Sequence, residues 1–184
     1  MELIDTHAHI YLDNFSGDRQ QVVDQAKAAG VSRVYLPNID SSSIQGMMDL
    51  GEAYPDFFYP MMGIHPTSVN ADYQKELEVV EQWLARYEFA AIGEIGIDLY
   101  WDKTFQKEQK DAFRVQIEWA KEKGMPIVIH SRDSFREIFD VMEQVNDERL
   151  EGIFHSFSGT LEDARHIIDL GFKIGINGIA TFKN

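Results

Sequence analysis

The chain has 184 residues, 44% of them hydrophobic and 26% charged, which suits a single globular domain covering residues 1–184. It contains no cysteine, which excludes disulfides and thiolate zinc sites, and no apolar run approaches the roughly 18 residues that a membrane-spanning helix needs. The net charge of −14 argues against a broad basic surface for long nucleic acids. The sequence begins without a secretion signal, so we expect a cytoplasmic location and, for a complete chain, a monomer.

Short apolar runs alternate with segments of helical periodicity along the chain. The runs predict seven buried strands, at residues 3–6, 32–36, 57–63, 90–95, 126–130, 151–155 and 172–176. Six helices are expected between them, and four of these have clear bounds, at residues 18–29, 105–123, 133–143 and 161–170. Gly30, Gly124 and Gly171 follow three of these helices, as expected for residues that end a helix in the left-handed conformation.

The alternation of strands and helices predicts parallel strands, and their apolar composition predicts burial on both faces. An open doubly wound sheet and a closed (β/α)8 TIM barrel both have this pattern. Polar clusters follow five of the strands, and a barrel brings all its strand ends to one rim, whereas an open sheet offers one crevice. We therefore predict an α/β fold, a (β/α)8 barrel truncated after strand seven, without its eighth strand and the helices beside it.

Two of the polar clusters contain residues that suit a metal. His7 and His9 are two residues apart and would face the same side if the first strand extends to them; the alternative is a polar strand end. Glu94 lies among apolar residues and glycines, where a carboxylate must be paired or bind metal. It could bridge two metals, and the alternative is a salt bridge with Arg132 or a lysine.

The remaining candidates follow later strands. His130 and His155 each come directly after an apolar run; either alone is more often a core residue, but the pair at equivalent points beside Glu94 favours a metal centre. His65 could bind metal or present its ring to substrate. Arg132 could bind a phosphate with two hydrogen bonds or pair with a nearby acid such as Asp133 or Glu94.

Aromatic residues follow the fourth strand. Tyr100 and Trp101, just after Asp98, lie in the predicted loop at the rim. Their rings could stack on a nucleobase, or they could simply cap the barrel. The sequence favours neither reading.

Together these motifs resemble those of the TatD-type deoxyribonucleases, part of a wider amidohydrolase-like group of metal-dependent barrels. The resemblance rests on five ordered segments: Asp5-Thr6-His7-Ala8-His9, Gly63-Ile64-His65-Pro66, Gly93-Glu94-Ile95-Gly96-Ile97-Asp98, Pro126-Ile127-Val128-Ile129-His130-Ser131-Arg132 and His155-Ser156-Phe157-Ser158-Gly159. It implies two divalent cations, Mg²⁺, Zn²⁺ or Mn²⁺. His7 and His9 would hold one, His130 and His155 the other, and Glu94 would bridge them as the catalytic carboxylate.

The implied activity is hydrolysis of DNA phosphodiesters by a metal-activated water, in a 3′-to-5′ exonuclease mode. DNA strand ends would be engaged locally, with His65 and Arg132 on the phosphate. Ser156 stands where many members carry cysteine and Leu99 where tyrosine is common. The family's last ligand, an aspartate after strand eight, has no counterpart in this chain. Two alternatives follow: a hydrolase of another ester, amide or phosphoester, and an inactive truncated fragment with exposed sheet edges.

Overall fold

The computed structural model describes residues 2–182, so the expected domain limits, Met1 and Asn184, lie outside the described residues. The strands are β1 (Leu3–Asp5), β2 (Val31–Pro37), β3 (Phe58–Met61), β4 (Ile92–Asp98), β5 (Ile127–Arg132), β6 (Gly152–Phe154) and β7 (Lys173–Ile174). The α-helices are α1 (Arg19–Ala28), α2 (Ile44–Ala53), α3 (Tyr73–Leu84), α4 (Gln106–Lys123), α5 (Phe135–Val145) and α6 (Leu161–Asp169). Short 3-10 helices are η1 (Asp13–Phe15), η2 (Pro66–Ser68) and η3 (Gly178–Thr181).

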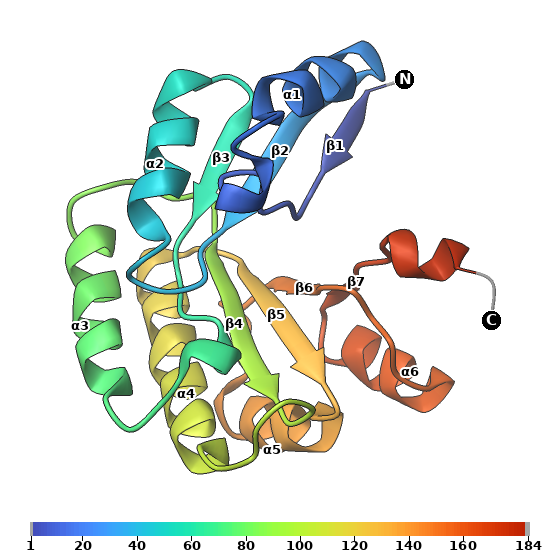
Figure 1. Cartoon of the computed structure of the whole chain (residues 1–184). Helices are drawn as coiled ribbons and strands as arrows, with labels where there is room; N and C mark the ends of the chain where they lie inside the picture. The colour runs from blue at the N-terminus through green and yellow to red at the C-terminus, as the bar shows by residue number, and fades with distance from the viewer. Residues whose placement is uncertain (1, 183–184) are drawn as a thin grey trace.

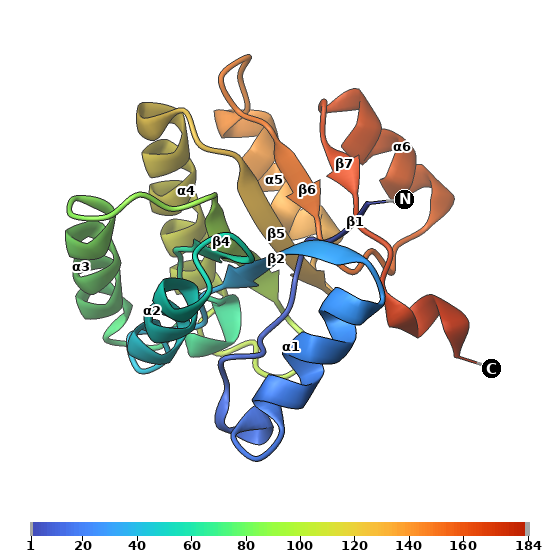
Figure 2. The ribbon, with the colours of Figure 1, turned by 90° about the horizontal axis from the view of Figure 1, so that it is seen from above.

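The strands form two parallel sheets, ordered β1-β2-β3 and β4-β5-β6-β7 (Figure 1). An isolated parallel bridge between Met62 and Ile92 connects them. Seen from above, the helices surround the strands (Figure 2). Within residues 2–182, no pairing joins β1 to β7, so the ring of strands stays open there. The predicted α/β barrel architecture with seven parallel strands is confirmed.

The main core lies between the strands and the surrounding helices. In α4, Phe113 and Ile117 are one helical turn apart and fully buried, so they form one apolar face. Gly124 ends this helix with φ of 62°, as its glycine predicts. A smaller cluster formed by Met61, Ala91 and Val128 contains residues from both sheets. No helix in residues 2–182 has both the length and the apolar character to cross a membrane.

Most strands differ from the predicted ranges by one to three residues at their ends, and two of these ends bear on the candidate site. β1 stops at Asp5, one residue before its predicted end, so His7 and His9 do not lie on this strand. The segment still follows β2, because the Ala8 amide donates a hydrogen bond to the Tyr35 carbonyl. β4, in contrast, runs three residues beyond its predicted end at residue 95, to Asp98.

Gly96 explains the longer β4. A Cβ atom at this position would lie 2.1 Å from the carbonyl oxygen of His130, and its φ is 137°. Only glycine allows β4 to approach β5 this closely. Gly96, which lies just beyond the predicted end of this strand, is therefore required for the packing of β4 against β5.

Candidate metal centre

Glu94 lies at the centre of the candidate site. Every residue of β4 is buried, and the Glu94 side chain itself is 3% exposed. The pairing register of β4 with β5 shifts between Gly93 and Ile95, which places Glu94 at an irregularity of the ladder. Such a bulge can redirect a side chain. The alternative for Glu94, a salt bridge to Arg132 or a lysine, is absent among residues 2–182, because the neighbours of Glu94 are histidines.

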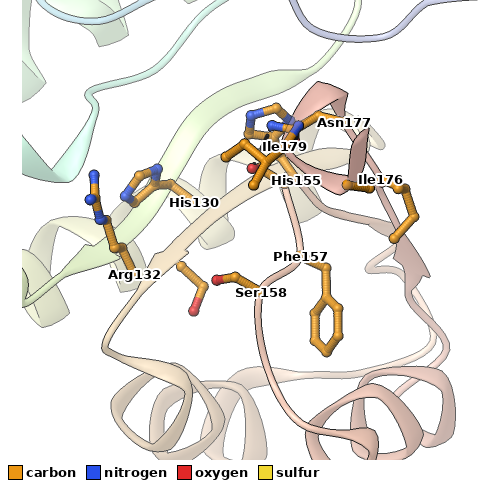
Figure 3. A pocket seen from close by; sticks show the side chains of 11 residues that line it. His130, Arg132, His155, Phe157, Ser158, Ile176, Asn177 and Ile179 are labelled. Carbon is orange, nitrogen blue, oxygen red and sulfur yellow. Dashed lines mark hydrogen bonds between the residues drawn. The ribbon is translucent and has the colours of Figure 1, made fainter. Parts of the chain in front are cut away.

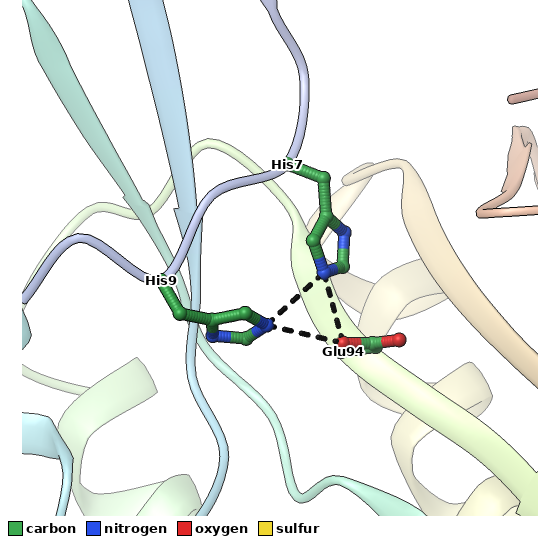
Figure 4. Close-up of side chains that lie close together, drawn as sticks. All are labelled: His7, His9 and Glu94. Atoms are coloured by element: carbon green, nitrogen blue, oxygen red, sulfur yellow. Dashed lines mark hydrogen bonds and ion pairs between the residues drawn. The ribbon is translucent and has the colours of Figure 1, made fainter. Parts of the chain in front are cut away.

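One carboxylate oxygen faces the N-terminal histidines. Oε2 of Glu94 lies 3.0 Å from Nε2 of His7 and 3.6 Å from Nε2 of His9. The two Nε2 atoms are 3.2 Å apart (Figure 4). The three side chains each offer a ligand atom within 4.8 Å of the others. This donor set of two imidazoles and one carboxylate fits a divalent cation such as Zn²⁺ or Mn²⁺.

The other oxygen faces a second pair of histidines. Oε1 of Glu94 lies 3.0 Å from Nδ1 of His130 and 3.7 Å from Nε2 of His65. These two ring nitrogens are 3.2 Å apart. The carboxylate therefore lies between two imidazole pairs, an arrangement that suits a bridging ligand.

The local charges keep Glu94 ionised. Burial alone would raise the pKa of Glu94, but the contacts of its carboxylate with the His130, His7 and His9 rings outweigh burial and hold the pKa well below 4.5. Burial lowers the pKa of His65 to about 4, so this ring is neutral at pH 7. Burial also disfavours charge on His130, but its contacts with Asp98 and Glu94 prevail and raise its pKa to about 9.

Tyr11 fixes the tautomer of His9. Its hydroxyl donates to the Pro37 carbonyl at 2.6 Å, so it must accept the 3.0 Å hydrogen bond from Nδ1–H of His9. Burial raises the pKa of Tyr11, which keeps this hydroxyl protonated. The free lone pair of His9 is then on Nε2, facing Glu94. Hydrogen bonds of this kind orient metal-binding histidines.

The tautomer of His65 is the opposite one. The backbone amide of Thr67 donates to Nδ1 of His65 at 3.2 Å, so the proton of the neutral ring is on Nε2. Nε2 points toward Glu94 and His130. In this tautomer His65 offers a hydrogen-bond donor to the centre rather than a lone pair, which agrees with its expected substrate contact more than with a ligand role.

His155 lies beside the centre but outside both clusters. Its ring stacks on His7 with centroids 3.3 Å apart and an 8° interplanar angle. Burial, with His7 nearby, lowers its pKa to about 4. His130 and His155 do line a common cavity of about 470 Å³ with Arg132 (Figure 3). His65 is the histidine that forms a cluster with His130 and Glu94, and the expectation that His130 and His155 hold one cation together stays a prediction.

Arg132 and Asp98 have partners that the sequence did not indicate. The Arg132 guanidinium lies 3.8 Å from the ring centre of Tyr100 and 5.1 Å from that of Trp101, and among the described residues it has no ion pair with Asp133 or Glu94. Asp98, expected in a loop, ends β4 and accepts a 2.9 Å hydrogen bond from Nε2 of His130.

Tyr11 and Asp98 are the residues that sequence reasoning missed. Asp98 had a signal, because a carboxylate near the end of a buried strand needs a partner, as was argued for Glu94. Tyr11 had none: its contact with His9 depends on the turn after β1 and on the Pro37 carbonyl of β2.

Comparison with known proteins identifies the family of this chain. The family model described as TatD related DNase matches residues 4–184. This chain belongs to the TatD-related DNase family. A Bacillus subtilis relative named "Uncharacterized metal-dependent hydrolase YabD" is 36% identical over 182 residues, which cover 99% of this chain and 71% of that protein.

Two further relatives extend the comparison. The crystal structure of YJJV, a TatD homologue from Escherichia coli, superimposes with a TM-score of 0.89 at 31% identity, covering 98% of this chain and 70% of the other. A protein of Pectobacterium carotovorum named "3'-5' ssDNA/RNA exonuclease TatD" is 28% identical, covering 96% of this chain and 68% of the relative. The chain is thus a member of a family of metal-dependent hydrolases, some of which are named nucleases.

Proposed function

We propose that this protein hydrolyses DNA phosphodiesters at strand ends, in a 3′-to-5′ mode, with two divalent cations. One observation carries the proposal: the two oxygens of the ionised, buried Glu94 each face a different pair of imidazoles. The exonuclease named among the relatives supports a nucleic-acid substrate. A cytoplasmic location and a monomeric complete chain remain predictions.

The roles of the side chains follow from their contacts. Bound cations would neutralise phosphate charge and would lower the pKa of a water molecule, so that hydroxide is supplied as the nucleophile near neutral pH. His7, His9, Glu94 and His130 would hold the cations, with His130 giving up a ring proton on binding, and His155, whose ring stacks on His7, would be a further donor. The Nε2–H of His65 would donate to a phosphate oxygen.

Arg132 supports the substrate assignment. It lines the cavity beside His130 and is exposed in a protein of net charge −14. A guanidinium can hold a phosphate oxygen pair with two parallel hydrogen bonds. This cationic group at the mouth of the site favours an anionic substrate over a neutral ester or amide.

The test compares substrates and one isosteric variant. End-labelled single-stranded DNA and 4-nitrophenyl acetate are incubated in parallel with Mg²⁺, Mn²⁺ or EDTA. We expect metal-dependent release of nucleotides from DNA, at least 100-fold slower in Glu94→Gln. Glu81→Gln, a change on the exposed face of α3, is the matched control and should retain activity.

Cleavage of the acetate ester but not of DNA would support the alternative, an amidohydrolase-like enzyme with another substrate. No hydrolysis of either with any metal would support the inactive fragment. Full activity of Glu94→Gln would remove the bridging role of this carboxylate.

A further inference from the structure

The loop after β4 presents two large aromatic side chains at the rim. Trp101 is 69% exposed and Tyr100 is 53% exposed, in an edge-to-face contact with ring centres 4.9 Å apart. Two adjacent aromatic rings that are this exposed at the rim of the candidate site can stack on a ligand with a flat face.

Asp98 connects this loop to the candidate metal centre through hydrogen bonds. Oδ1 of Asp98 accepts hydrogen bonds from the backbone amides of Tyr100 at 3.0 Å and Trp101 at 3.2 Å. Its other oxygen, Oδ2, accepts from Nε2 of His130 at 2.9 Å. One buried carboxylate thus connects the aromatic loop to a residue that contacts Glu94. The backbone that carries the two rings is therefore anchored to the centre through Asp98 and His130.

Arg132 completes the arrangement. Its guanidinium lies against the Tyr100 ring and near the Trp101 ring, and among residues 2–182 it has no acidic partner within 4.0 Å. A cation that rests on aromatic rings is oriented without being neutralised. It stays available to an anion in the adjacent cavity, which it lines with His130.

We propose that Tyr100, Trp101 and Arg132 form a nucleotide subsite for an unpaired strand end. Arg132, supported by Tyr100, holds a phosphate next to the centre, and Trp101 stacks on the adjoining base. The inference rests on the proposed function and adds the side chains that would recognise the terminal nucleotide, which requires a terminal base that is free to stack. A base inside a duplex has both faces covered and cannot use Trp101.

Binding of matched probes tests the subsite. A fluorescein-labelled (dT)10 with phosphorothioate linkages, which slow turnover, is titrated with protein and Mg²⁺ and followed by fluorescence anisotropy. Three further probes are compared with it: the same strand with an abasic terminal residue, the ribo-oligonucleotide (U)10, and a blunt duplex. The proteins are wild type, Trp101→Ala, Trp101→Phe and Tyr87→Ala, the last an exposed aromatic on the segment after α3.

We expect Trp101→Ala to raise the Kd for (dT)10 on the order of tenfold, since stacking on one aromatic side chain supports effects of that size. Trp101→Phe should recover most of the affinity, and Tyr87→Ala should bind like wild type. Wild type should bind the abasic strand as weakly as Trp101→Ala binds the normal one. Trp101→Ala should no longer distinguish the two strands. Similar results with (U)10 would extend the subsite to RNA.

The proposal is overturned if Trp101→Ala binds (dT)10 like wild type or still distinguishes the abasic strand from the normal one. It is also overturned if the substitution weakens binding of the blunt duplex as much as binding of (dT)10. Failure of wild type to bind any strand also overturns it. These outcomes are separate from the proposed function, because hydrolysis is measured on all-phosphate strands in its own assay. Base-dependent binding without hydrolysis would leave the subsite standing and remove the catalytic proposal.

Discussion

Replacing Tyr11 with phenylalanine tests whether its hydroxyl orients His9 as a metal ligand, because His9 itself is left unchanged. Tyr11→Phe removes one oxygen and keeps the ring, which is 4% exposed. Two groups lose their partner: Nδ1–H of His9 and the Pro37 carbonyl. The imidazole can then turn or place its proton on Nε2, the nitrogen that faces Glu94.

The expected magnitudes follow from these two bonds. Loss of a hydrogen bond that orients a metal ligand weakens metal affinity by roughly 10- to 100-fold, or about 1.4–2.7 kcal/mol. The buried Pro37 carbonyl without a donor lowers the free energy of unfolding by roughly 1–3 kcal/mol. His9 contributes less to this loss, because its side chain is 26% exposed and water can replace the hydroxyl.

Zn²⁺ affinity is measured by competition with a chelating dye, and the free energy of unfolding by urea titration in EDTA. Tyr54→Phe is the matched control, since it also removes a hydroxyl hydrogen bond, to Gln20, away from the centre. Unchanged Zn²⁺ affinity in Tyr11→Phe, together with the expected stability loss, would refute the role of Tyr11 in orienting His9.

Three more outcomes are expected. Adding Zn²⁺ at about 100 times its Kd to EDTA-treated protein should raise Tm by roughly 5–10 °C, and Glu94→Gln should abolish this rise in a thermal scan. Gly96→Ala should lower the urea-derived stability by at least about 2 kcal/mol, since its Cβ would meet the His130 carbonyl; a wild-type midpoint would contradict the close approach. Hydrogen bonds from Arg149, and secondarily Lys121, lower the pKa of Asp147 below its usual 3.8, so this carboxylate stabilises the fold above about pH 4 and loses that effect as pH falls. Asp147→Asn should therefore be less stable at pH 7, with the difference shrinking below about pH 4 in urea titrations. A constant difference would count against these ion pairs.

The sequence predicted the elements of the barrel better than their ends. The strand-helix alternation was visible because buried parallel strands carry apolar runs, such as Ile127-Val128-Ile129 at the start of β5. The ends depend on contacts between distant segments. β4 continues past residue 95 because Gly96 fits against the His130 carbonyl, which no local pattern indicates.

Site residues could be predicted from the sequence where burial of their side chain costs free energy unless it has a partner. Glu94 stood out for this reason, and the structure surrounds it with His7, His9 and His130. The neighbours within the site were not predictable, because they depend on ring orientation. His65 rather than His155 lies beside His130, and Arg132 turns to Tyr100 instead of an acid.

The centre also joins the two halves of the fold. His7 and His9 come from the segment after β1, in the first sheet, while Glu94 belongs to the second. The two sheets share one hydrophobic core and are joined at the backbone by the Met62–Ile92 bridge and by hydrogen bonds between Asn38 and residues 93 and 94. Bound ions would add a cross-link between the N-terminal segment and β4, so the stability of this part of the fold would rise with the cation concentration.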